Sequence, residues 1–415
     1  MGIWQRITGR SGEQRQSIED PRVPISSGNI LRFFGIEETS SAGESVTVDS
    51  ALGVPAIWAS VNFMAGTLAG LPLQVYRRTR QGRERSTGQL ATLLHDAVND
   101  EMSSFDWRKY FFDQVFTHGR AVTFIERNAS GRVINLWPLD PQALTVRKVD
   151  GRKFYDYADG GSRKVTYAAA DVIDVAFMLK HNQLEHRGPI ASNRNVVGLA
   201  QAVTKYGSKF FANGGVPPFA IEGPFSTPGA VQRASDDLAE AVKKAARENR
   251  LALSLPAGHT IKQIGADPEK SQLVELQRFV IEQVARIYSL PPTFLQDLTH
   301  GTFSNTEQQD LHFVKHTLKR WVEQFEQEMN LKLFGRSSRS QYVEMNVDGL
   351  LRGDFKTRMD GYATGIQNGI LKPNEARQQE NRPSDPAGDR LFIQGATVPI
   401  TQAGEPEGEA NDNAV

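Results

Sequence analysis

The stretch "YSLPPTFLQDLTHGTFSNTEQQDLHFVKHTLKRWVEQFEQEMNLKLF", residues 288–334, places an uncharged segment between two helix-forming patterns. Residues 298–306 carry no charged side chain, and Gly, Ser, Thr and Asn surround the single aromatic Phe303. Small polar residues of this kind favour turns and loops. Thr306 with Gln309 three positions later then matches a capping box, which opens a helix. The sequence therefore predicts an uncharged loop that leads directly into a helix.

The helix after this loop is predicted to span 307–334, a length of roughly 40 Å at a rise of about 1.5 Å per residue. Its apolar residues recur at spacings of three and four, as one buried face requires. They are Leu311, Val314, Leu318, Trp321, Phe325 and Met329. A second apolar stripe, over the helix predicted at 271–288, comprises Leu273, Leu276, Val280, Val284 and Ile287. The two stripes exceed what one slim subunit covers, which suggests packing against further copies of the chain.

The N-terminal half combines helical and strand patterns as an α+β fold does. A helix is predicted over 51–70, a strand over 71–78, a helix around 87–99 and another over 104–119 with Ser104 as its N-cap. Residues 120–180 then form β-rich runs joined by Gly, Asn and Asp turns. Residues 51–76 carry no charge, but their prolines and polar residues favour a buried helix followed by a strand over a membrane span.

In the second half, a helix over 192–212 is closed by an Asn-Gly-Gly sequence that suits a left-handed C-cap. A small αβ unit is predicted next. It comprises a strand at 219–223, a helix at 228–249 capped by Thr227, and strands "RLALSLP" (250–256) and "HTIKQI" (259–264). The Leu290-Pro291-Pro292 sequence ends the 271–288 helix. A strand at 341–347, a helix at 350–369 and a helix capped by Asn374 finish the ordered chain.

The composition and the absence of known motifs exclude several classes of active site. Lys and Arg number 48, as do Asp and Glu, so the formal net charge is zero, which is unusual for a protein that grips nucleic acid. The absence of cysteine excludes disulfides, thiolate catalysis and Cys-ligated metals. The chain also lacks a phosphate-binding loop, a dinucleotide-binding glycine motif and a nucleophile elbow.

The remaining chemical candidates favour a structural interpretation. His312 and His316 share a helix face, but the Glu of a metalloprotease helix is missing. Asp171 and Asp174 would point to opposite faces of a strand, so a joint acid–base role is not expected. The arginine-rich 77–85 sequence is interpreted as a solvated hairpin turn rather than a nucleic-acid or acidic-partner contact, because no aromatic residue interleaves with it. We therefore predict no catalytic residue, no metal and no cofactor, and thus no enzyme.

The 288–334 stretch closely resembles the portal (head-to-tail connector) proteins of long-tailed bacteriophages and of phage-derived gene transfer agents. The shared elements are LPP, F-S-N-x-E-Q-Q, a T-L-x-x-W helix core and an E-Q-x-x-N end. Three other segments resemble the family in the same order: "GRVINLWPLDPQALTV", "KFFANGGVPPFAIEGP" and "DFKTRMDGYATGIQNGILKPNEARQQENRPSDPAGDRLFI". Together these segments place nearly all of residues 50–393 within the resemblance.

The resemblance implies a portal fold with an α/β wing, a two-helix stem, a small αβ clip, a long channel helix and an α-helical crown. In chain order the implied parts are a disordered arm (1–48), the wing (49–190), a stem helix (191–215), the clip (216–268), a stem helix (269–292), the tunnel loop (293–306), the long wing helix and strand (307–348), the crown (349–393) and an acidic disordered tail (394–415).

The implied function is structural. Twelve copies would form a ring at one capsid vertex, nucleate head assembly, conduct double-stranded DNA during terminase-driven packaging and during ejection, and join head to tail. The implied partners are the chain itself as a dodecamer, the major capsid protein, the large terminase, the head-completion adaptor and double-stranded DNA in the channel, with no membrane. The implied location is the portal vertex of the virion, after assembly in the host cytoplasm.

Two groups of site residues follow from the resemblance. The tunnel-loop residues beside the DNA are Thr299, His300, Gly301, Thr302, Phe303, Ser304 and Asn305. The clip residues facing terminase and adaptor are Arg233, Asp237, Glu240, Lys244 and Arg247. Because the loop holds no Lys or Arg, it is expected to touch DNA lightly, with Phe303 against either the DNA or a neighbouring loop.

Two alternatives from other classes stay open on the residues alone. One is a cytosolic nucleic-acid-processing enzyme whose site has no recognisable motif. The other is a soluble scaffold that oligomerises without DNA. The mass of the purified assembly separates them from a portal ring.

Overall fold

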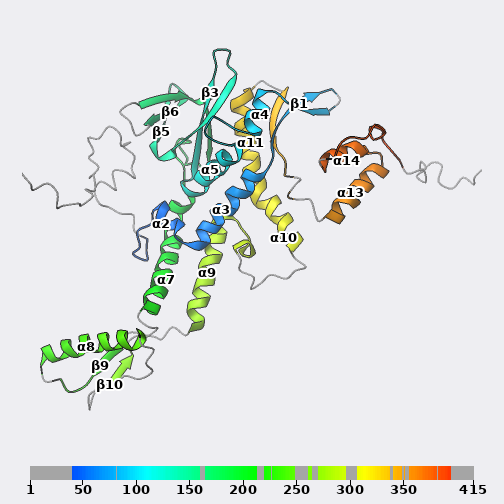
Figure 1. The fold of residues 1–415 in the computed structure, drawn as a ribbon. Coiled ribbons are helices and arrows are strands. Elements are labelled where there is room, and N and C mark those ends of the chain that lie inside the picture. Colours follow the sequence, from blue (N-terminus) through cyan, green and yellow to red (C-terminus); the bar gives the residue numbers. More distant parts are fainter. Residues whose placement is uncertain are drawn as a thin grey trace, which may run out of the picture. The chain divides into compact units, whose positions relative to one another are not determined.

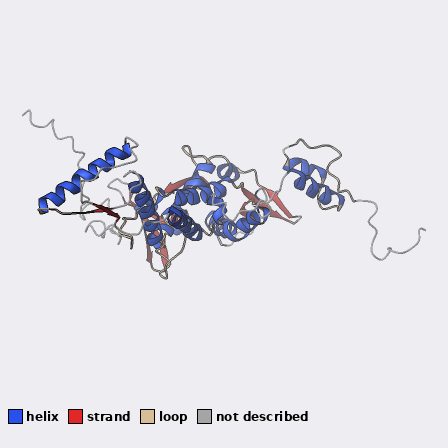
Figure 2. Cartoon of the chain, turned by 90° about the horizontal axis from the view of Figure 1, so that it is seen from below, coloured by secondary structure: helices blue, strands red, loops and turns tan. Residues whose placement is uncertain are grey.

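A computed structural model describes residues 40–80, 82–158, 164–212, 219–225, 227–247, 260–263, 270–295, 306–336, 340–347, 350, 355–380 and 382–393. The chain divides into two compact units, residues 1–346 and 347–415. Helices and antiparallel sheets are combined in the first unit, which is the α+β class that the sequence predicts (Figure 1; Figure 2 colours the same elements by type).

The first unit contains three small antiparallel sheets in its body. One has the order β4-β3-β8, and its strands are β3 (Arg120–Arg127), β4 (Val133–Leu139) and β8 (Val172–Ala176). The second has the order β5-β6-β7, formed by β5 (Leu144–Val149), β6 (Arg152–Ala158) and β7 (Lys164–Ala168). The third has the order β11-β1-β2, formed by β1 (Leu73–Thr79), β2 (Gly82–Arg85) and β11 (Gln341–Met345).

Helices pack on these sheets and on one another. In chain order they are α2 (Val48–Leu52), α3 (Pro55–Gly70), α4 (Gln89–His95), α5 (Ser104–Thr117), α6 (Pro189–Ser192), α7 (Arg194–Ala212), α9 (Lys270–Tyr288), α10 (Thr306–His312) and α11 (Lys319–Phe334). Contacts join α3 to α5, α7 to α9, and α11 to both β8 and β11 (Figure 1).

An aromatic cluster between α5 and α11 forms the centre of the core. Trp107, Phe111 and Phe112 of α5 surround Phe325 of α11, with ring centroids 5.3 to 5.9 Å from it. None of these four side chains is more than 1% exposed. Each aromatic pair of this kind adds about 0.5–1.5 kcal/mol beyond its buried area. The apolar seam predicted for the long helix is thus confirmed from Val314 to Met329, all of whose members are buried, whereas its first member, Leu311, is 40% exposed.

Polar side chains of α11 bind the open edge of β8. Gln324 Nε2 donates to the Ala176 carbonyl (2.9 Å), and Glu328 Oε1 accepts from the Asp174 N–H (3.1 Å). An edge strand leaves such backbone groups without a strand partner, and burying them unpaired would be costly. The spacing of four residues between Gln324 and Glu328 brings both side chains to the same helix face.

The same helix also binds the open edge of β11. Asn330 accepts from the Val343 N–H (2.6 Å) and donates to the Val343 carbonyl (3.1 Å), while Glu326 accepts from the Met345 N–H (2.6 Å). Helix α11 therefore joins two sheets that do not pair with each other.

A buried ion pair crosses the sheet beneath this helix. Arg120 of β3 and Asp174 of β8 lie 2.6 Å apart with both side chains at most 7% exposed, and Tyr155 donates to Asp174 (2.7 Å). Burial alone would raise the pKa of Asp174, but the Arg120 charge and these hydrogen bonds hold that pKa below its usual value. Asp171 lies in a turn and pairs with Arg127 (3.1 Å) instead. The two carboxylates thus have separate partners and form no joint acid–base site.

A small αβ insert contains β9 (Phe219–Glu222), α8 (Pro228–Arg247) and β10 (Thr260–Gln263). Strands β9 and β10 pair antiparallel. As predicted, Thr227 caps α8, since its hydroxyl accepts from the Ala230 N–H (3.3 Å). The predicted strand at 250–256 lies outside the described residues.

The second unit contains α13 (Phe355–Gln367) and α14 (Pro373–Gln379). Lys372, rather than the predicted Asn374, is the N-cap of α14, because Pro373 occupies the first helical position. The buried Asn374 amide instead binds the backbone of Asp385. In the first unit the N-cap of α5 is likewise Ser103, which accepts from the Asp106 N–H, and the predicted cap Ser104 is buried in the first turn.

Two other differences from prediction concern the N-terminal part. The single helix predicted over 51–70 is two helices, because α2 ends at Leu52 with Gly53 as its C-cap and Pro55 opens α3. Residues 40–47 of the predicted arm contact α7, where Lys205 binds Glu44 (2.9 Å). Residues 1–39 and the predicted tail, 394–415, lie outside the described residues. Within the part of the chain that the structure describes, no helix is long and apolar enough to span a membrane.

The carboxylate of Glu326 makes stability at the β11 edge depend on pH. Burial, and then the nearby charges of Glu344 and Glu323, raise its pKa above the usual value despite the Met345 N–H. In the unfolded chain the Glu326 carboxyl has its ordinary pKa of about 4.3. As the pH rises above this value, the unfolded chain releases the Glu326 proton before the folded chain does. The free energy of unfolding therefore falls until the pH reaches the raised folded-state pKa. We expect Glu326→Gln, which retains an acceptor for Met345, to gain stability relative to the parent chain between about pH 4 and pH 7.

Urea unfolding at both pH values measures this difference. The exposed Glu101→Gln is the matched control and should show no such gain, because the Glu101 carboxylate is not among the charges that raise the pKa of Glu326. Equal pH dependence in the parent chain and Glu326→Gln would contradict the assignment.

Candidate functional site

Helix α9 ends in a tight turn that redirects the chain at Ser289. The N–H groups of Ser289 and Leu290 donate to the carbonyls of Arg286 (3.2 Å) and Ala285 (2.9 Å), which is the Schellman pattern. Ser289 adopts a φ of 55°, in the left-handed region that this motif requires. Pro291 follows at once, so the chain leaves the helix direction at this position, as the sequence predicts.

Two hydroxyl groups hold the turn in place. Tyr288 Oη donates to the Phe116 carbonyl of α5 (3.0 Å), and Thr317 Oγ1 donates to the Ser289 carbonyl (2.6 Å). Tyr288 is 4% exposed, and burial raises the pKa of its hydroxyl, which keeps the group protonated and able to donate. The end of α9 is therefore fixed to α5 and to the helix that follows residues 296–305.

That following helix is not regular throughout. Residues Phe313–Leu318 form a π-helical segment between α10 and α11, where the sequence predicted one continuous α-helix over 307–334. π-helical turns occur mostly as short interruptions and are frequent at functional sites. Here the segment directs Phe313, Val314, Thr317 and Leu318 into the interior, and Thr317 is the residue that binds Ser289.

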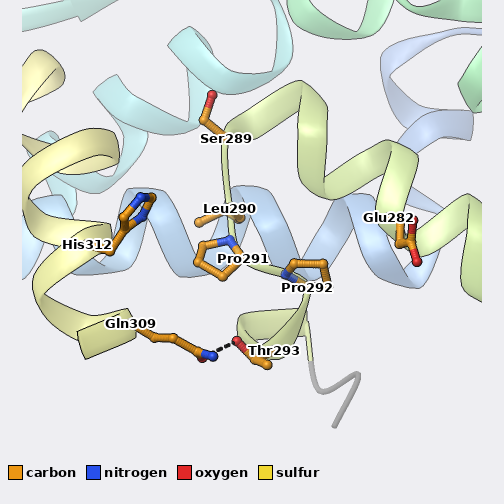
Figure 3. A pocket seen from close by; sticks show the side chains of 8 residues that line it. All are labelled: Glu282, Ser289, Leu290, Pro291, Pro292, Thr293, Gln309 and His312. Carbon is orange, nitrogen blue, oxygen red and sulfur yellow. Dashed lines mark hydrogen bonds between the residues drawn. The ribbon is translucent and has the colours of Figure 1, made fainter. Parts of the chain in front are cut away.

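The chain on either side of residues 296–305 is tied together directly. Thr293 Oγ1, in the 3-10 turn η3 (Pro292–Leu295), donates to Gln309 Oε1 of α10 at 2.8 Å (Figure 3). Phe294 and Phe313 lie with ring centroids 4.9 Å apart, and Phe63 of α3 contacts both rings, at 5.2 and 5.3 Å. We call this group the loop base: residues 288–295, 309–317 and Phe63.

A cavity of about 410 Å³ lies at the loop base (Figure 3). Its lining residues are Glu282, Ser289, Leu290, Pro291, Pro292, Thr293, Gln309 and His312. The one carboxylate in this set binds Arg286 (3.2 Å). The cavity therefore brings together apolar groups, an amide and an imidazole, and no pair of groups arranged for acid–base catalysis.

The two histidines singled out in the sequence lie next to each other on the surface. The rings of His312 and His316 have centroids 4.3 Å apart, and both residues are exposed. Among the described residues, no three His, Asp or Glu side chains are grouped so that they could hold a metal ion.

Of the two predicted groups of site residues, the structure describes the clip residues and not the tunnel-loop residues. The tunnel-loop residues, 299–305, lie outside the described residues. The predicted clip residues all belong to α8, where Arg233, Asp237, Glu240 and Lys244 are exposed and Arg247 is the last helical residue. Their spacing of three and four places them along one face of the helix, away from the buried Leu238.

The loop base was only partly visible in the sequence. Gln309 was assigned to a capping box with Thr306, whose side chain is not among those the structure describes. The hydrogen bond that the Gln309 side chain accepts from Thr293 was not predicted. No local sequence pattern marked Ser289, Thr317 or Phe63 as part of this site, because the residues they contact are distant in sequence. The contiguous LPP motif was the one local sign of this site.

Known proteins with similar sequences were found over most of the chain. The sequence model of the family described as "Phage portal protein" matches residues 55–381. A probable portal protein of Streptomyces phage phiC31 is 29% identical over 410 residues, covering 94% of this chain and 87% of the relative. The portal protein of Enterobacteria phage HK97 is 27% identical over 380 residues, covering 89% and 88%.

A solved structure shares the fold. It is a chain from the neck of a native GTA particle computed with C12 symmetry, with a TM-score of 0.55 and 17% identity. The alignment covers 81% of this chain and 92% of that one.

The bond between Thr293 and Gln309 can be tested with a double-mutant cycle. We expect Thr293→Val, Gln309→Met and the double variant to show a coupling of about 0.5–1.5 kcal/mol, as for a partly exposed neutral hydrogen bond. Amide hydrogen exchange within α10 reports the local opening, and it should accelerate in each single variant to a similar extent. Additive effects of the two substitutions would show that the bond does not hold the two sides of the loop together.

Proposed function

The chain belongs to the phage portal protein family, and on that premise we propose that its copies assemble into a ring of twelve at one vertex of a phage or gene-transfer-agent capsid. The observation that carries the proposal is the family match over residues 55–381, which includes the loop base and both sides of residues 296–305. The similar chain from a particle neck computed with C12 symmetry supports the subunit number. Closed rotational symmetry also satisfies head-to-tail contacts between copies.

We assign the family's parts to this chain as the sequence suggested. The wing would comprise 49–190 and 307–348, the stem α7 and α9, the clip 216–268 and the crown 349–393. The exposed apolar residues on α9, Val274, Leu276 and Phe279, support packing of the stem against neighbouring copies.

In this proposal the ring conducts double-stranded DNA, and residues 296–305 face the channel. The loop base supports this role because it fixes both sides of the segment through two hydrogen bonds and an aromatic cluster. Residues 299–305 carry no Lys or Arg. Each cationic contact to a phosphate would release counterions and strengthen binding. A segment of this composition thus touches moving DNA without holding it.

The clip face on α8 is proposed to bind the large terminase during packaging and the head-completion adaptor afterwards. It presents two carboxylates between cationic residues: Arg233, Asp237, Glu240, Lys244 and Arg247. Exposed charges of both signs give specificity and fast association rather than high affinity, which suits partners that must replace each other. The chain has no nucleotide-binding loop, so the terminase would supply the energy.

The same ring would nucleate head assembly with the major capsid protein and release DNA during ejection. Its role is structural, in keeping with the family, and we assign it no catalytic residue, metal or cofactor.

The ring predicts the mass of the purified assembly. Twelve subunits of 46.0 kDa give about 550 kDa, which mass photometry measures directly. An end-on electron-microscopy view should show twelve-fold symmetry around a central hole. A stable monomer at high protein concentration and moderate salt would contradict the proposal and favour an enzyme, whereas a closed oligomer that never contains DNA in particles would favour a scaffold.

The loop assignment predicts a separation between assembly and packaging. Phe303→Ala should leave the ring mass unchanged and lower the amount of DNA packaged or retained per particle. Phe294→Ala is the matched control, because Phe294 belongs to the loop base and its loss should reduce folding stability instead. If Phe303→Ala abolished folding, Phe303 would be a core residue and the loop assignment would be wrong.

A further inference from the structure

The β11-β1-β2 sheet lies at an edge of the first unit, with β1 labelled in Figure 1. Its exposed face carries arginine and tyrosine side chains. Leu73 and Val75 of β1 face the core, and so do Val343 and Met345 of β11. Because side chains alternate along a strand, the intervening residues face outward. Tyr76 stands opposite Tyr342 and Arg85, and Arg78 stands opposite Arg83.

These outward residues form a stacked row. The Arg83 guanidinium lies 4.7 Å from the Tyr76 ring centroid, and the Arg78 guanidinium lies 5.1 Å from that of Tyr342. The two tyrosine rings stack on each other at 5.7 Å. The sequence-based interpretation of a solvated turn rested on the lack of aromatic residues within 77–85, and it did not include the tyrosines that the fold places beside these arginines. Tyr342, far along the chain, supplies one ring.

Charge on this face is only partly neutralised. Arg77 pairs with Glu84 (3.2 Å), and Arg83 binds both carboxylate oxygens of Glu344 (2.7 Å each). The remaining arginines of the hairpin, Arg78, Arg80 and Arg85, are exposed and have no ion pair with any described residue.

A hollow of about 270 Å³ adjoins the row. Its lining includes Arg78, Arg336, Gln341 and Tyr342, so two guanidinium groups and a side-chain amide border one small space. Arg336 is exposed and, like Arg78, pairs with no carboxylate among the described residues. The planar guanidinium and amide donors and the size of the hollow suit an oxyanion such as a phosphate group.

We propose that this face, the arginine face (Arg78, Arg80, Arg85 and Arg336), binds the phosphate backbone of double-stranded DNA at a site separate from the loop. The inference rests on the proposed function, in which double-stranded DNA is the cargo. The Arg78 guanidinium is held against the Tyr342 ring, so it loses less freedom when it binds. The forked donors of all four arginines match phosphate oxygens. The tyrosine rings are stacked on each other and on arginines, so they offer no free face to an unpaired base, which favours a duplex backbone over a single strand.

A closed circular duplex tests this face separately from the channel, since it has no end to thread through a closed ring. We expect the full-length assembly to bind a relaxed plasmid weakly and with strong salt dependence. In Arg78→Gln/Arg80→Gln/Arg85→Gln, the slope of log K against log salt concentration should fall in magnitude by about 2.7, at about 0.9 for each lost phosphate contact. The control Arg132→Gln/Lys148→Gln/Arg152→Gln removes the same charge from exposed residues on other hairpins and should leave the slope unchanged.

Three results would overturn the proposal. They are no binding of the plasmid by the parent assembly, equal slopes in the parent and the arginine-face variant, and equal losses in that variant and the control. An arginine-face variant that binds plasmid normally but yields fewer particles would assign the face to an acidic protein surface instead. Ring mass and packaging of linear DNA are measured on the same variants, so failure of this site is distinguishable from failure of the portal function.

Discussion

Helix α11 satisfies the open backbone edges of two sheets at once, and the rest of the first unit depends on this arrangement. Its polar side chains bind β8 on one side and β11 on the other, while Phe325 enters the aromatic cluster of α5. A buried strand edge without hydrogen-bond partners would destabilise the fold, and an exposed one would invite pairing with other chains. One helix therefore closes both edges and joins two sheets that do not pair with each other.

The fixed position of α11 extends to the loop base. The π-helical segment continues directly into α11, so Thr317 and Phe313 are held by the same packing. Through Thr317 the helix fixes Ser289, and through Phe313 it fixes Phe294. The core thus sets the positions of the described residues on both sides of 296–305. This fixed base supports the proposal that the segment between them contacts DNA.

The formal charges of the chain sum to zero, but charged side chains are distributed unevenly over its surfaces. The segment proposed to face the channel has no cationic side chain, and the α8 face carries two carboxylates between cationic residues. The β11-β1-β2 sheet places arginines against stacked tyrosines. In our proposal, electrostatic attraction to DNA therefore belongs to the arginine face and is absent from the segment that faces the channel. A net charge alone gave no indication of this division, because local fields act over about 10 Å at ordinary salt.

Short-range patterns in the sequence determined the elements and the class of the protein. The three-and-four spacing from Val314 to Met329, the Thr227-Pro228 helix start and the LPP end of α9 are local signals, and the family motifs are contiguous. The tertiary structure alone decided which distant groups meet. Tyr342 completes the arginine row, Thr293 binds Gln309, and Thr317 binds the Ser289 carbonyl. Such pairings depend on the relative placement of whole elements, which packing sets and which no local pattern encodes.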